Sequence, residues 1–113
     1  MVRIDSTSFG EVVVDGKTYY SDVTVWWDGI VEFRDKLHVF SMKEFTKIMV
    51  RKPESIVIGT GQHGVVKVPD EVEEAAEKNK VDLFIETSPK AVQIFNSFLT
   101  EGKKVVAVIH STC

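Results

Sequence analysis

Residues 55–64 read SIVIGTGQHG, an apolar run that ends in glycines at positions 59, 61 and 64 with the spacing G-x-G-x-x-G. The continuous apolar run is typical of a strand that is covered on both faces. In dinucleotide-binding proteins a loop with this spacing leads directly into a helix, whose first amides face the pyrophosphate. Here the loop is followed by VVKVP at 65–69, which is β-branched and extended in character. The sequence therefore predicts a tight glycine turn after a buried strand. The one feature that favours a dinucleotide is Glu86, which lies about 20 residues further on, where a ribose-binding acid would stand.

The second half of the chain is predicted to form a βαβαβ unit. Two more apolar runs, VDLFIE at 81–86 and VVAVIH at 105–110, resemble the first one. A helix with a thin apolar stripe and an otherwise acidic surface is expected to have Pro69 in its first turn. A second helix with a broad apolar stripe is expected between an N-cap at Ser88 and a stop at Gly102.

The first half is predicted to be a β-meander followed by one helix. Residues 8–34 alternate between polar and apolar types, and Asp15-Gly16 and Asp28-Gly29 are hairpin turn signals between the apolar runs. Ser41 and Glu44 have the spacing of a capping box, and apolar residues follow at helical intervals. This helix is expected to end before Pro53, because the residue that precedes a proline is pushed out of the α region.

These elements predict a mixed α/β (α+β) fold in three layers. The N-terminal β-meander packs with the βαβαβ unit around a mixed central sheet, as a single domain over residues 1–113. A chain of 113 residues with 43% hydrophobic content has enough apolar surface for one core. No apolar run approaches the roughly 18 residues of a membrane span, and no targeting segment is recognised. We therefore expect a cytoplasmic protein that does not enter a membrane.

Charge and cysteine content narrow the function further. The net charge of −3 argues against nucleic acid as a partner, because such proteins usually present a basic surface to the phosphates. The single cysteine, Cys113, cannot form an internal disulfide, so nothing in the sequence requires an oxidising compartment.

Polar residues follow each of the three strands predicted in the βαβαβ unit. If these strands are parallel with right-handed crossovers, their carboxyl ends lie on one edge of the sheet. A strand order of 2-1-3 within the unit would place the glycine loop across a crevice from the end of the last strand. Hydroxyls, imidazoles and a helix N-terminus would gather there and hold a small anion or polar ligand. The residues predicted for this site are Gly59, Thr60, Gly61, Gln62, His63, Thr87, Ser88, His110, Ser111, Thr112 and Cys113.

Several of these residues also have a purely structural interpretation. His110 ends an apolar strand, which favours a hydrogen-bonded core histidine over a ligand-binding one. His63 is expected to be an exposed loop residue. The α-carboxylate on Cys113 disfavours its thiolate, which argues against a nucleophile. A zinc site built from His63, His110 and Cys113 lacks paired-ligand spacing. The sequence thus indicates no metal, no cofactor and no catalytic residue.

The pair Trp26-Trp27 offers a candidate surface for a protein partner. Adjacent strand residues face opposite sides, so Trp27 shares the face of Val25 and Trp26 lies on the other face. Trp26 is expected either to be covered by the helix at 41–50 or by the loop around Asp28, or to be exposed as an aromatic anchor.

Five short stretches together carry a resemblance to a known family. They are IDSTSFG at 4–10, VVVDGKTY at 12–19, IVIGTGQ at 56–62, the spacing of Thr87, Ala91 and Phe95-Asn96, and HSTC at 110–113. Along nearly the entire chain, the sequence resembles a family of small domains of unknown function. Its eukaryotic members include the adipogenesis-associated domain protein and the mitochondrial complex I assembly factor 3. The resemblance implies a β-meander packed with an α/β sheet, and it implies no established enzymatic activity, cofactor or catalytic residue.

Two departures from the family bear on function. Phe95-Asn96 stands where many relatives have Tyr-Asn, and no transit sequence supports a mitochondrial role.

Two classes of function remain. The first is a non-catalytic protein-binding or assembly-factor-type module, which could also form a homo-oligomer. The second is a small-molecule-binding or anion-binding protein, or an enzyme, that uses the crevice at the carboxyl ends of the parallel strands.

Overall fold

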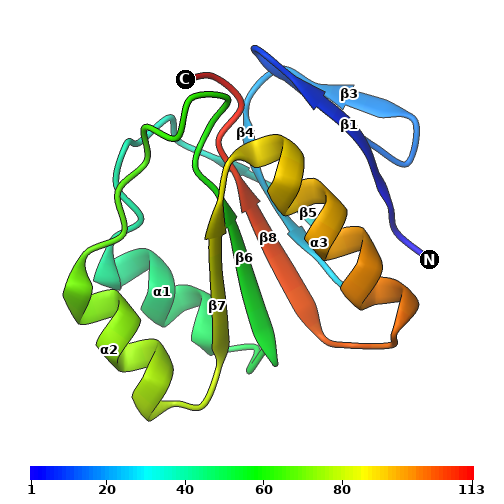
Figure 1. Ribbon diagram of the computed structural model, residues 1–113. Coiled ribbons are helices and arrows are strands. Elements are labelled where there is room, and N and C mark those ends of the chain that lie inside the picture. The colour runs from blue at the N-terminus through cyan, green and yellow to red at the C-terminus, as the bar shows by residue number, and fades with distance from the viewer.

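The computed structural model describes residues 1–113 and arranges them in three layers around a central sheet (Figure 1). The strands are β1 (Ile4–Ser8), β2 (Glu11–Val14), β3 (Lys17–Tyr19), β4 (Asp22–Trp26), β5 (Val31–Arg34), β6 (Ser55–Gly59), β7 (Asp82–Glu86) and β8 (Val105–Ile109). The helices are α1 (Met42–Met49), α2 (Asp70–Lys78) and α3 (Ser88–Thr100). The predicted βαβαβ unit is therefore present, and its strand positions agree with the prediction to within a residue at each end.

The central sheet has five strands in the order β5-β4-β8-β6-β7. β6 runs parallel to β7 and to β8, whereas β4 is antiparallel to β8 and to β5. The prediction of a mixed α/β fold is confirmed. All five residues of β4, of β6 and of β8 are buried, which agrees with strands that are covered on both faces.

The N-terminal meander is divided between two sheets. β1, β2 and β3 form a separate antiparallel sheet, while β4 and β5 extend the sheet of the βαβαβ unit. The small sheet packs beside α3, and the two together cover one face of the central sheet, opposite α1 and α2 (Figure 1). The meander supplies both a covering layer and the antiparallel half of the central sheet.

Alternating side chains of the central strands feed two separate cores. Val57 and Ala107 point toward α3 and the small sheet. Ile56 and Val106 point toward α1 and α2. The period of two along each strand thus assigns every apolar side chain of β6 and β8 to one layer or the other. No helix is both long enough and apolar enough to cross a bilayer; the longest, α3, has 13 residues.

The helix ends follow the sequence signals with three differences. Pro69 is the N-cap of α2 rather than a residue of its first turn. The Ser41 hydroxyl accepts a hydrogen bond from Glu44 N–H at 3.2 Å, as predicted, but the Glu44 carboxylate binds Arg34 instead of returning to the Ser41 backbone. Ser88 is not the N-cap of α3, so that prediction is wrong. Thr87 holds the N-cap position without a side-chain bond, and Ser88 is the first helical residue. Its hydroxyl is used by the glycine loop and the end of β8, as described below.

One side chain ties the small sheet to α3. Asn96 accepts a hydrogen bond from Ile4 N–H at 3.0 Å and donates one to Ile4 C=O at 2.8 Å. The amide of Asn96 therefore acts as a neighbouring strand for one residue of β1. This bond joins positions 92 apart in the sequence and fixes the small sheet on the helix.

Candidate functional site

The carboxyl ends of β6, β7 and β8 lie together at one edge of the central sheet (Figure 1). The order β7-β6-β8, with all three strands parallel, is the 2-1-3 order on which the predicted site depends. The glycine loop (residues 59–64) and the C-terminal tail (residues 110–113) are therefore neighbours. We call the surface that they form with the start of α3 the rim.

Ser88 joins the glycine loop to the C-terminal tail. Its hydroxyl donates to the His110 carbonyl at 2.7 Å and accepts from Gly61 N–H at 3.0 Å, and its own N–H donates to the Gly61 carbonyl at 3.0 Å. Ser88 is fully buried. The first amide of α3 is consequently used within the protein rather than directed at an external anion.

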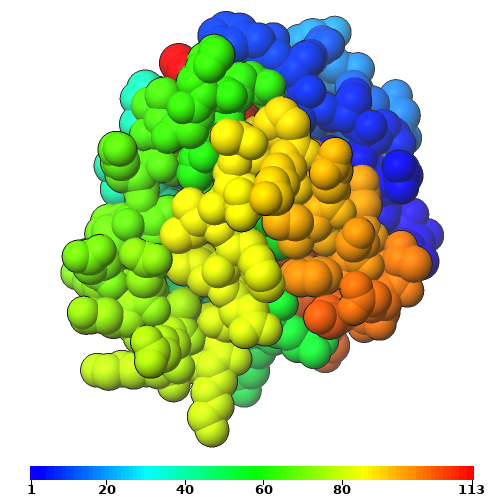
Figure 2. Space-filling view, viewed as in Figure 1, coloured from blue at the N-terminus to red at the C-terminus, as the bar shows by residue number.

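The tail lies directly on the glycine loop. Gln62 N–H donates to the Thr112 carbonyl at 2.8 Å, and His63 N–H donates to a backbone oxygen of Cys113 at 3.0 Å. A Cβ atom added to Gly61 would overlap the backbone of Cys113 and lie 2.9 Å from the His110 ring, so only glycine permits this approach. In the space-filling view only a few red atoms of the tail show between the green loop and the blue N-terminal strands (Figure 2). The chain's own tail thus covers the loop side of the predicted crevice.

The remaining residues of the predicted site differ widely in exposure. Thr60 is buried, and its hydroxyl donates to the Glu86 carbonyl at 3.0 Å. His63 and Thr87 are exposed, which confirms His63 as a surface loop residue. The intermediate class contains Gln62, Thr112 and Cys113, whereas Gly59, Gly61, Ser88, His110 and Ser111 are buried. The structure brings the whole set to one edge, and binding of a small anion there stays a prediction.

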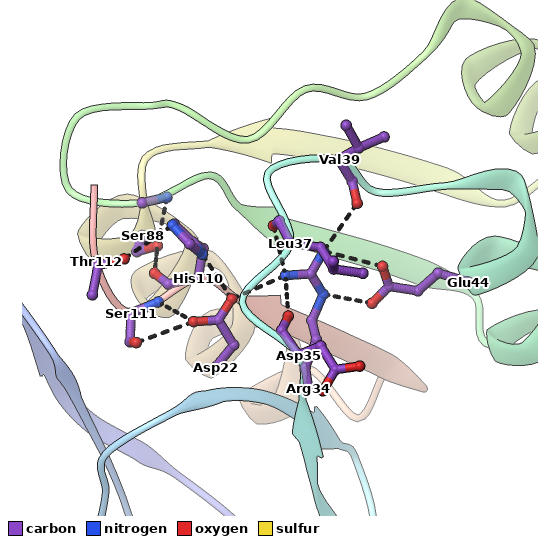
Figure 3. A network of polar contacts seen from close by, with 11 residues as sticks. Asp22, Arg34, Asp35, Leu37, Val39, Glu44, Ser88, His110, Ser111 and Thr112 are labelled. Carbon is purple, nitrogen blue, oxygen red and sulfur yellow. Dashed lines mark hydrogen bonds and ion pairs between the residues drawn. The ribbon is translucent and has the colours of Figure 1, made fainter.

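A buried carboxylate that the sequence did not single out organises the rim. Asp22, at the start of β4, is 0% exposed and accepts four hydrogen bonds (Figure 3). One oxygen accepts from His110 Nδ1 at 2.7 Å and from Arg34 Nη1 at 3.0 Å. The other accepts from the backbone N–H of Ser111 at 2.9 Å and from its hydroxyl at 3.1 Å. His110 is therefore a hydrogen-bonded core histidine, as its structural interpretation predicted.

Arg34 extends this network to α1. Its guanidinium binds both carboxylate oxygens of Glu44, through Nε at 2.6 Å and Nη2 at 3.1 Å (Figure 3). It also donates to the carbonyl groups of Leu37 and Val39, each at 3.3 Å. Nearly every donor of this buried cation has a partner, which is the condition for burying a charge without a large penalty.

The arrangement around His110 has the connectivity of a hydroxyl, an imidazole and a carboxylate. Thr112 Oγ1 lies 3.2 Å from His110 Nε2, and Asp22 lies on the other ring nitrogen. The imidazole is only 1% exposed, and the Asp22 charge is shared with Arg34. Both ring nitrogens are occupied, so the ring has no position left for a metal ion. The geometry is that of a structural network that holds the tail in place.

The sequence did contain a weak signal for this network. Asp22 opens an otherwise apolar strand, DVTVW at 22–26, and Arg34 closes the strand that pairs with it. A carboxylate in a strand that is buried on both faces needs donors around it. Their identity depends on the register Asp22↔Arg34 and on the tail, which lies 88 residues away.

Trp26 is not an exposed anchor, so that alternative is wrong. It is only 4% exposed and packs in the core beneath α1, with Phe45 and Ile48. Its indole N–H donates to Glu32, and the Arg51 guanidinium lies 4.4 Å from its ring centroid. The helix that begins after Ser41 covers it, as the other alternative proposed.

A groove of about 460 Å³ lies between β5 and α1. Its walls include Phe33 and Leu37 on one side and Lys43, Lys47 and Val50 on the other, and Trp26 lies in its floor. This hollow was not predicted, because its two walls come from elements whose relative position the sequence does not give.

Arg51, which lines the groove, forms an ion pair with Asp28. It binds the Asp28 carboxylate at 2.6 Å, and this hydrogen bond lowers the pKa of Asp28 from its usual value. The ion pair therefore stabilises the fold above the pKa that Asp28 has in the unfolded chain, and its contribution is lost as the pH falls through the lower pKa of the folded chain.

The chain is a small mixed α/β domain in which the C-terminal tail lies on the glycine loop. Residues 4–110 match the family of proteins of unknown function DUF498/DUF598, and the chain belongs to this family. A conserved hypothetical protein of Pyrococcus horikoshii is similar, with a TM-score of 0.87 and 24% identity over 98% of this chain and 99% of that one. A protein named MT938 is 29% identical, with a TM-score of 0.81 over 100% of both chains.

A more distant structure has the same fold. A Mth938-like domain of Bordetella pertussis is 14% identical, with a TM-score of 0.73 over 96% of this chain and 85% of that one. The resemblance to a family of small domains of unknown function is thereby confirmed at the level of the family.

The contact between Gly61 and the tail gives a first prediction. Gly61→Ala should displace residues 110–113, because the new methyl group overlaps the Cys113 backbone. We expect the Cys113 thiol to react with a disulfide reagent several-fold faster than in the wild type. Gly64→Ala is the matched control, since Gly64 also has a positive φ of 72° but a Cβ there meets nothing closer than 3.7 Å. Equal thiol reactivity in both variants would show that the tail does not depend on the close approach at Gly61.

Removal of the Asp22 charge gives a second prediction. Asp22→Asn leaves Arg34 buried with one carboxylate fewer, and breaking a buried pair in this way typically costs about 3–5 kcal/mol. We expect a loss of that order in the free energy of unfolding, measured by urea titration. Glu44→Gln is the control and should lose less, because the Glu44 side chain is 19% exposed. A loss below about 1 kcal/mol for Asp22→Asn would contradict the role assigned to this network.

Proposed function

We propose that this chain is a non-catalytic protein-binding module and that a partner docks in the groove between β5 and α1. The observation that carries the proposal is an open edge strand beside this groove. β5 is the outermost strand of the central sheet and has β4 as its only neighbour. An unpaired strand edge is a template for another chain, and proteins that expose one without a use for it usually protect it.

The backbone groups that face outward on β5 follow from its pairing. Trp26 N–H donates to the Ile30 carbonyl, so the hydrogen-bonded pairs of the ladder alternate from there and include Glu32 and Arg34. The N–H and C=O groups of Val31 and Phe33 then point away from β4. The turn, loop and cap hydrogen bonds of the chain use none of these four groups.

Exposed apolar side chains along the groove also favour docking of a partner there. Phe33 and Val50 are each 76% exposed, and Leu37 is 52% exposed. Of the two charged residues of β5, Arg34 is buried and only Glu32, which accepts from the Trp26 indole, is exposed. The opposite edge strand, β7, begins at Asp82 and ends at Glu86, which places charges at both of its ends.

Two further points favour a binding role over catalysis. His110 is buried, with both ring nitrogens occupied, so it does not reach a substrate. The sequence also resembles, among other members of its family, the mitochondrial complex I assembly factor 3. An assembly role for this chain, and its location in the cytoplasm, are part of the proposal.

A comparison of alanine variants at two exposed phenylalanines tests the proposal. Phe33→Ala should reduce capture of the partner from native lysate about tenfold, because exposed aromatic side chains are frequent hot spots. Phe9→Ala is the matched control: Phe9 is 65% exposed but lies in the turn between β1 and β2, outside the groove. Partner abundance is measured by quantitative mass spectrometry against an empty matrix. The proposal fails if no protein is enriched over the matrix, or if both variants retain it equally.

A polar ligand at the rim is a second candidate function, which a separate observation favours. The side-chain nitrogen of Gln62 is buried and has no hydrogen-bond partner, although a buried donor normally has one. A small anion bound there should raise the melting temperature of the wild type and not that of Gln62→Ala. Thermal shift with inorganic phosphate, sulfate and nucleotides measures this, and a flat response of the wild type to all of them would remove the candidate.

A further inference from the structure

We infer that the groove accepts an extended segment of a partner protein that adds to β5 as a strand and alternates acidic with apolar side chains. This inference rests on the proposed function and specifies the chemistry of the partner. Strand addition uses backbone hydrogen bonds for affinity and alternate side chains for specificity. The two faces of β5 determine what those alternate side chains meet.

One face of β5 is apolar. Val31 packs against the core cluster that contains α3 and the small sheet. Phe33 lies on the same face and contacts Tyr19 edge to face, with ring centroids 5.9 Å apart. Phe33 is 76% exposed. Every second side chain of an added strand would lie beside these rings, which favours an apolar residue there.

The other face of β5 looks onto α1. Glu32 and Arg34 lie on this face and bind Trp26 and Glu44. Beyond them stand Lys43 and Lys47, one helical turn apart on the wall of the groove. Both lysines are exposed, and neither has an ion-pair partner within the chain. The intervening side chains of an added strand would point toward them.

The charge around the groove differs in sign from that of the chain. Its lining has four cationic residues (Arg34, Lys43, Lys47, Arg51) and three acidic ones (Glu32, Asp35, Glu44), which gives a net charge of +1. The whole chain has a net charge of −3, so the residues outside the lining sum to −4. Four charged residues of the lining have no ion pair within the chain: Glu32 and Asp35, in β5 and directly after it, and two lysines of α1. The α1 wall therefore has two unpaired cations, Lys43 and Lys47. Carboxylates spaced two residues apart on an extended segment would complement this pair.

A display library of random ten-residue segments, selected on the intact chain, tests the pattern directly. We expect the enriched segments to carry Asp or Glu at alternate positions with apolar residues between them. The double variant Lys43→Glu with Lys47→Glu should weaken binding of an enriched acidic peptide by about tenfold or more, and the weakening should shrink at high salt. The control, Lys78→Glu with Lys104→Glu, changes the net charge equally at exposed residues outside the groove.

A proline variant of β5 tests whether the partner segment adds as a strand. Val31→Pro removes an N–H that points outward, so the ladder with β4 stays intact while the bond to an added strand is lost. Val31→Ala shortens the side chain and keeps the N–H. We expect the proline variant to lose peptide binding and the alanine variant to keep it, with circular dichroism showing that both are folded.

The outcomes separate this inference from the proposed function. If Phe33→Ala abolishes partner capture but enriched segments show no alternating acids, or bind the Lys43→Glu, Lys47→Glu variant equally well, the inference fails and the binding module stands. Binding that survives Val31→Pro would likewise overturn strand addition. Self-association of the chain, measured by sedimentation and abolished by Val31→Pro, would assign the edge to a second copy and overturn the partner segment. Absence of any enriched segment, together with absence of a captured partner, would overturn both.

Discussion

The buried Asp22 carboxylate is the constraint on which the arrangement of the chain depends. A charge at 0% exposure is tolerable only when donors surround it, and its four donors come from two regions far apart in the sequence, Arg34 and the adjacent residues His110 and Ser111. Arg34 brings in β5 and, through Glu44, the helix α1. His110 and Ser111 bring in the end of β8. One group therefore fixes the antiparallel half of the sheet, a covering helix and the C-terminal tail relative to one another.

Periodicity predicted the parts of the fold that depend on local composition. The runs SIVIG and VVAVIH have the right length and β-branched content for strands covered on both faces, and they form β6 and β8 as expected. The glycine loop does not lead into a helix, because α2 starts only at Asp70. The division of the meander between two sheets was beyond local reasoning, since β4 joins β8 through pairing with residues 80 or more positions away.

The candidate site shows the same limit in another form. The chain direction of β6, β7 and β8 placed the predicted residues at one edge, so their proximity could be anticipated from topology. Their mutual hydrogen bonds could not, because a crevice and a filled contact have the same sequence pattern. Ser88 illustrates the point: its position suggested a helix cap, whereas its buried hydroxyl bridges Gly61 and His110. The groove on β5 arises where an unpaired strand meets a neighbouring helix, so the amino-acid composition does not predict it.

The position of β8 has a consequence for how the protein forms during synthesis. β8 lies third among the five strands of the central sheet, between β4 and β6, yet it follows all the others in the chain. While the ribosome is still making residues 105–109, β4 and β6 each lack a neighbour along one side. The unpaired N–H and C=O groups along these sides then stay open to other nascent chains until β8 leaves the exit tunnel. Assembly of the central sheet is therefore expected to wait for β8, after β4 and β6 have already been made.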